Sequence, residues 1–149
     1  MPRFIAFRIQ HFSLLVIASA GVAQPASSRD HTVTGCSENF VVSGNAAEGY
    51  SFRTFQQRPR PEPSAVLGRA GRTLASMGFA ISEIHSEFGI ISSSAQNGAV
   101  TLNVIVSPVG GEPSGTRMEA VVQLRASATS PPAVVRRELC ELIEASFGS

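Results

Sequence analysis

The chain has 149 residues, of which 43% are hydrophobic and 15% charged, a composition typical of a folded globular protein rather than of a disordered chain. This length allows one domain, or a small domain with an appendage. The formal net charge is only +1, so the charge balance excludes the strongly basic surface that nucleic-acid binding requires.

The first 23 residues are predicted to be a secretory signal peptide. Arg3 and Arg8 precede an apolar run that is too short to cross a bilayer as a helix. The run ends in small residues, which allow cleavage after Ala23 or, alternatively, after Ala20. An uncleaved anchor is the other interpretation, and no later segment is long and apolar enough to be transmembrane. We therefore expect a periplasmic or secreted protein with no nucleic-acid partner, whose mature chain has a net charge of about −1.

Four segments are predicted in the mature chain. Residues 24–35 are small and polar and should form a flexible leader. Residues 36–57 contain two short apolar stretches around the turn residues of "GNAAEG", which predicts a short β-hairpin. Residues 58–63, "RPRPEP", have proline at every second position and should form an extended linker. An α+β domain is expected over residues 64–149.

The first helix of this domain is predicted over residues 64–77, where apolar residues recur at spacings of three and four. Ser64 is the expected N-cap, and Gly78 should end the helix in the left-handed conformation. Gly68 and Gly71 weaken the helix by roughly 1 kcal/mol each relative to alanine. Glycines at such positions suggest close packing of the helix against another element.

A second amphipathic helix is predicted at the C-terminus, with Ser130 as its N-cap and Pro131 as its first residue. Its apolar stripe consists of Val135, Leu139, Leu142, Ile143 and Phe147. Its solvated side consists of Arg136, Arg137, Glu138, Glu141 and Glu144. Both helices therefore need an apolar surface to cover.

Four strands are predicted between the helices, over residues 79–84, 88–94, 99–106 and 116–125. Asn97-Gly98 suits a type I′ turn between the second and third of these strands. Apolar residues alternate with polar ones in the last two strands, which is typical of a sheet with one buried face. The pattern predicts a two-layer α+β fold, an antiparallel β-meander with both helices packed on one face.

The mature chain has two cysteines, Cys36 and Cys140. Exported proteins reach an oxidising compartment, where such a pair usually forms a disulfide. The stretch Val33-Thr34-Gly35-Cys36 also resembles a lipobox. However, the charged and polar leader separates Cys36 from the apolar run, and drawing those charges into the membrane is costly. We therefore predict a disulfide and no lipid anchor.

One cluster of side chains could bind a metal ion or catalyse a reaction. Glu83, His85 and Glu87 occupy alternate positions, so on an extended strand they would share a face and could form a metal site or an acid–base pair. A solvated strand edge explains the same spacing, because it matches no metal-ligand signature. The P-loop, dinucleotide, nucleophile-elbow and CxxC patterns are missing from the sequence, so no cofactor is predicted.

A second candidate is the solvated face of the predicted sheet. Arg117, Glu119 and Arg125 are expected there, where they could bind a partner or only keep the face soluble. Export and the lack of catalytic motifs favour a non-enzymatic envelope module that binds a protein partner or a small ligand. Strand addition at a sheet edge would serve such a module without special side chains. The alternative is a small metal-dependent or acid–base enzyme centred on Glu83, His85 and Glu87.

The segment from Ala65 to Arg125 resembles small envelope domains of the outer-membrane assembly lipoprotein C type. The resemblance is carried by a helix that ends in Gly78-Phe79 before a meander of strands, and by Gly89 in "GIISSS". These positions are structural, so the resemblance implies an α+β envelope domain but no functional residue. Those lipoproteins carry the lipid-bearing cysteine at the signal cleavage site, and this chain does not.

Overall fold

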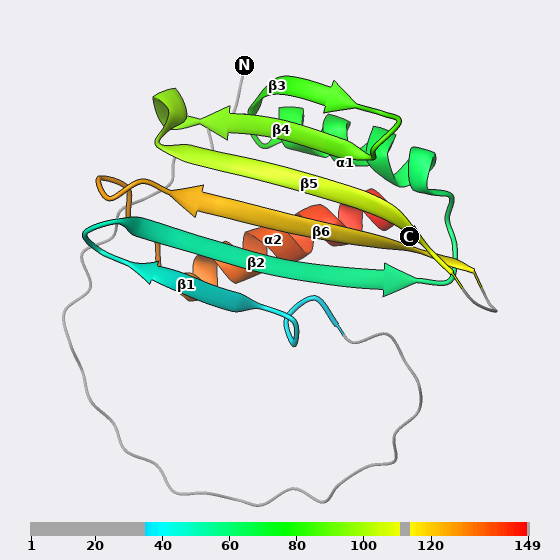
Figure 1. Ribbon diagram of the computed structural model, residues 1–149, viewed down its shortest axis with the longest axis horizontal. Coiled ribbons are helices and arrows are strands. Elements are labelled where there is room, and N and C mark those ends of the chain that lie inside the picture. Colours follow the sequence, from blue (N-terminus) through cyan, green and yellow to red (C-terminus); the bar gives the residue numbers. More distant parts are fainter. Residues whose placement is uncertain (1–34, 111–113, 149) are drawn as a thin grey trace, which may run out of the picture.

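A computed structural model describes residues 35–110 and 114–148 of the protein. The predicted signal peptide and nearly all of the predicted leader lie outside these residues. Six antiparallel strands form one sheet in the order β1-β2-β6-β5-β4-β3, and the two helices lie against one face of it (Figure 1). The predicted two-layer α+β fold is confirmed. The elements are β1 (Val41–Asn45), β2 (Gly49–Arg58), α1 (Pro63–Ser76), β3 (Ala80–His85), β4 (Ile90–Ala95), η1 (Gln96–Gly98), β5 (Val100–Val109), β6 (Gly115–Leu124) and α2 (Pro132–Phe147).

The N-terminal hairpin is part of this sheet, which differs from the predicted series of hairpin, linker and separate domain. β2 pairs with β6 along nearly its whole length, with Phe52 opposite Val122. Two inward positions of β2 carry the polar residues Thr54 and Gln56, both buried. They interrupt the apolar alternation that would have indicated a strand of the core sheet. Residues 58–63 therefore connect two elements of one domain.

α1 begins one residue earlier than predicted and has no side-chain cap. Pro63 lies in its first turn and Glu62 is the N-cap residue, so Ser64 falls inside the helix. A proline suits the first turn because its fixed φ is helical and the missing N–H has no partner there. The other end matches the prediction: Gly78 has φ +87°, and the Phe79 N–H donates back into the last turn.

α2 also starts at a proline rather than at a serine cap. Pro132 is its first residue and Pro131 its N-cap residue. The hydroxyl of Ser130 is buried and has no hydrogen-bond partner in the described part of the chain. The prediction that Ser130 caps this helix is therefore wrong. All five residues of the predicted apolar stripe of α2 are buried, as expected.

The core lies between the helices and the inner face of the sheet. The inward residues predicted for the two central strands are all buried: Val100, Leu102, Val104, Val106, Met118, Ala120, Val122 and Leu124. The predicted turn before β5 is also present. Asn97 and Gly98 both have positive φ, +55° and +81°, and the Ala99 N–H donates to the Gln96 carbonyl at 3.1 Å.

A disulfide joins Cys36 to Cys140, with their Cα atoms 5.6 Å apart and a sequence separation of 104 residues. The bond ties the segment before β1 to α2. The Thr54 hydroxyl supports this segment by donating to the Cys36 carbonyl. The disulfide prediction is confirmed, and the bonded Cys36 sulfur is not free to carry a lipid. Among the described residues, none of the helices has the length and apolar character needed to cross a membrane.

Candidate functional site

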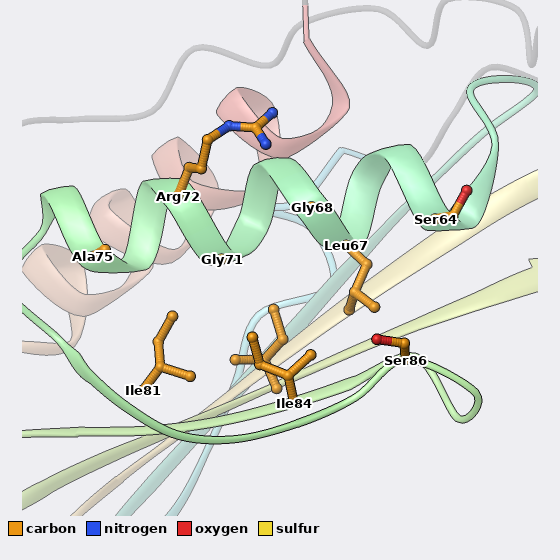
Figure 2. Close-up of a pocket in the computed structure, with 10 residues that line it drawn as sticks. Ser64, Leu67, Gly68, Gly71, Arg72, Ala75, Ile81, Ile84 and Ser86 are labelled. Carbon is orange, nitrogen blue, oxygen red and sulfur yellow. The ribbon is translucent and has the colours of Figure 1, made fainter.

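A groove of about 520 Å³ lies between α1 and the edge of the sheet at β3 (Figure 2). Its volume falls in the range of ligand-binding clefts, roughly 300–1,000 Å³. Its apolar lining comes from Leu67, Gly68, Gly71 and Ala75 on the helix and from Ile81, Ile84 and Ile91 on the sheet. Ser64, on the helix, and Ser86, in the turn after β3, lie at the same end of the groove (Figure 2). Arg72 also lines the groove, and its guanidinium points away from the sheet (Figure 2). The cleft is thus mainly apolar, with two serines at one end.

Two glycines of α1 open this groove. A Cβ at Gly71 would lie 3.7 Å from Ile91 Cδ1, and a Cβ at Gly68 would lie 3.8 Å from the Arg72 guanidinium. Both distances are ordinary van der Waals contacts, and neither glycine has a positive φ. The close packing predicted at these positions is therefore not present among the described residues. The missing side chains instead leave open the space between the helix and β3.

β3 is an edge strand with little cover from the rest of the described chain. It pairs with β4 on one side, and Ile84 is 53% exposed, while Phe88 in the following turn is 69% exposed. The register with β4 shifts between Ile81 and Glu83, so this bulge divides the edge into a short stretch, Ala80–Ile81, and a longer one, Glu83–His85. Unpaired backbone groups along such an edge can accept another strand.

The structure brings together two members of the predicted Glu83, His85 and Glu87 cluster. His85 Nε2 lies 3.2 Å from Glu83 Oε2, on the solvated face of the sheet, and both side chains are exposed. Glu87 lies in the turn, because β3 ends at His85. The expectation that all three share a strand face is therefore wrong. Over residues 35–110 and 114–148, no group of three His, Cys, Asp or Glu side chains is placed to hold a metal ion.

The predicted partner-binding face contains a compact ionic cluster. Glu119 contacts Arg53 at 2.7 Å and Arg117 at 3.1 Å, and the Arg117 guanidinium lies 3.6 Å from the centre of the Phe55 ring. Burial raises the pKa of Glu119, but the hydrogen bonds and charges of the two arginines outweigh it, so the pKa is lowered. Arg125 lies just beyond β6 and takes no part in these contacts. The carboxylate of Glu119 is therefore paired with arginines of the same sheet.

Sequence reasoning did not find the groove or the partners of Glu119. Arg53 and Phe55 join Glu119 because β2 pairs with β6, and that pairing was not predicted. The signal for the groove was present in the sequence, since Gly68 and Gly71 lie three residues apart on one side of a helix. Their spacing is compatible with close packing and with open space alike.

Comparison with known proteins finds no match: no family model, no curated protein and no solved structure is similar to this chain. The resemblance to the lipoprotein C type of domain therefore stays a prediction. The function has to be argued from the groove and the edge strand beside it.

Proposed function

We propose that this protein is an exported, non-enzymatic envelope module that binds a protein partner in an extended conformation. The binding site is the groove between α1 and β3 together with the free edge of β3. The partner adds a strand to β3, so main-chain hydrogen bonds supply much of the affinity. Apolar side chains on one face of that strand enter the groove, where their size and shape determine specificity.

The pair of glycines in α1 is the observation that carries the proposal. Glycine in a helix costs roughly 1 kcal/mol relative to alanine, and neither the backbone nor the packing requires glycine at Gly68 or Gly71. What the two residues provide is space beside Ile81 and Ile84. A helix that is weakened in order to keep a groove open is expected at a binding site, where function and stability conflict.

Two further observations support export and binding. A disulfide such as that between Cys36 and Cys140 is typical of proteins that leave the cytosol. The predicted signal peptide would direct the same export. The exposed apolar side chain of Ile84 lines the groove, where a partner would cover it. The exposed pair of Glu83 and His85 alone gives no comparable support to the alternative, an acid–base or metal-dependent enzyme.

Site-specific photo-crosslinking in cells that export the protein tests this proposal. A photoreactive amino acid replaces Ala75, which lines the groove, or Gln123, which is exposed on the opposite face of the sheet. We expect a discrete crosslinked protein from position 75 and none from position 123. Gly71→Leu should suppress the product by filling the groove, whereas Gly71→Ala should leave most of it. Equal crosslinking at both positions, no product at all, or a product unaffected by Gly71→Leu would contradict the proposal.

A further inference from the structure

We infer that the strand added to β3 is β3 of a second copy of this chain, so that two copies form a two-fold symmetric dimer through this edge. The inference rests on the proposed function, because it uses the same edge and groove. It is carried by the longer regular stretch of β3, Glu83–His85. When two copies of this stretch run antiparallel, the acidic residue of each lies opposite the histidine of the other.

Strand geometry limits how two copies of β3 can pair. In an antiparallel pair, side chains directly opposite each other point to the same face of the sheet. A two-fold axis between identical strands must therefore pass through a residue position. Within the longer regular stretch of the edge that position is Glu83, Ile84 or His85, because the bulge interrupts the edge before Glu83.

Charge selects among these three axes. An axis at Glu83 places the two Glu83 carboxylates opposite each other, and an axis at His85 brings Glu83 of each copy toward the turn that contains Glu87 of the other. Like charges directly opposite are destabilising. An axis at Ile84 places each Glu83 opposite the His85 of the other copy, and an imidazole N–H can donate to a carboxylate whether or not the ring is charged. The contact of 3.2 Å between Glu83 and His85 within one chain shows that the two side chains already associate.

The same axis also buries apolar surface. Ile84 is 53% exposed and points to the helix side of the sheet, where it lines the groove. With the axis at Ile84, the two isoleucines face each other, and the two grooves meet across the paired strands. The most exposed part of the groove lining is thereby covered by the second copy.

The contact is short, because the bulge before Glu83 ends the regular edge on one side and the turn after His85 ends it on the other. A small interface gives a weak, reversible dimer. We expect a dissociation constant on the order of 10⁻⁵ M.

Sedimentation velocity of the mature, oxidised protein tests this inference, at concentrations from roughly tenfold below to tenfold above the expected constant. The wild-type protein should pass from monomer to dimer. His85→Glu opposes two carboxylates and should weaken the dimer at least tenfold. The double variant Glu83→His/His85→Glu exchanges the two partners and should restore it. All of these side chains are exposed, so circular dichroism should show the same fold in each variant.

A variant of the other sheet edge serves as the matched control. Val42→Lys changes an exposed residue of β1 and should leave the dimer unchanged. A monomer at every concentration, a dimer that withstands His85→Glu, or a dimer lost through Val42→Lys would overturn the inference. If the protein is monomeric while position 75 still crosslinks to a different protein, the inference fails and the proposed function stands. If both signals are missing, both fail.

Discussion

The carboxylate of Glu119 is held by Arg53 and Arg117 on the solvated face of the sheet. Its pKa is lowered, so the stabilisation is present above the ordinary value of 4.5 and is lost as the pH falls through the lower folded-state pKa. We expect Glu119→Gln to reduce the free energy of unfolding by about 1–2 kcal/mol at neutral pH. Urea denaturation at several pH values should show that this difference disappears in acid. Glu87→Gln, at an exposed turn, should have no comparable effect.

Glu138 on α2 should respond in the opposite sense. Burial beside Phe79 and Leu139 raises its pKa, Arg137 lowers it, and Glu141 raises it further, with burial the largest cause. The folded state therefore favours the protonated form, and stability is lost as the pH rises through the raised pKa. We expect Glu138→Gln to raise the melting temperature at neutral pH, and this gain should vanish below the ordinary value of 4.5. A lower melting temperature at neutral pH would show that the charged form is the better partner of the core.

Among the elements, α1 contains Gly68 and Gly71, and Gly78 follows its C-cap with the opposite effect on stability. Gly68→Ala and Gly71→Ala should each raise the free energy of unfolding by about 0.5–1 kcal/mol, because a Cβ fits and helix propensity improves. Gly78→Ala should lower it by about 1 kcal/mol, because φ is +87° at that position although nothing obstructs a side chain. Chemical denaturation of the three variants measures both effects. Destabilisation by Gly71→Ala would mean that the helix packs closely there after all.

The sequence predicts those elements well in which one periodicity dominates. The buried stripe of α2 and the alternation in β5 and β6 follow directly from residue spacing. The predictions that Ser64 and Ser130 cap the helices were wrong, because a proline in the first turn can start a helix without a capping hydroxyl. The place of β2 was missed, because Thr54 and Gln56 fill positions where apolar residues were expected. The groove could not be predicted, because its width depends on where α1 crosses the sheet.

At the scale of the whole molecule, the disulfide connects the beginning of the described chain to its last helix. Closing a loop of this length restricts the unfolded chain, and the stabilisation can reach about 4.7 kcal/mol in the chain-entropy model. We expect dithiothreitol to lower the denaturant midpoint of the wild-type protein substantially. The double variant Cys36→Ala/Cys140→Ala should be insensitive to the reductant. Identical midpoints for oxidised and reduced wild-type protein would show that the bond adds no stability.

The strand order of the sheet also determines when the protein can complete its fold. β2 lies between β1 and β6, so Phe52 meets its neighbour Val122 only after most of the chain is present. A chain that leaves a translocation channel N-terminus first therefore carries an unfinished hairpin until β6 has emerged, and Cys36 finds Cys140 later still. Such long-range pairing slows folding. The topology thus places completion of the sheet after nearly the whole chain is present.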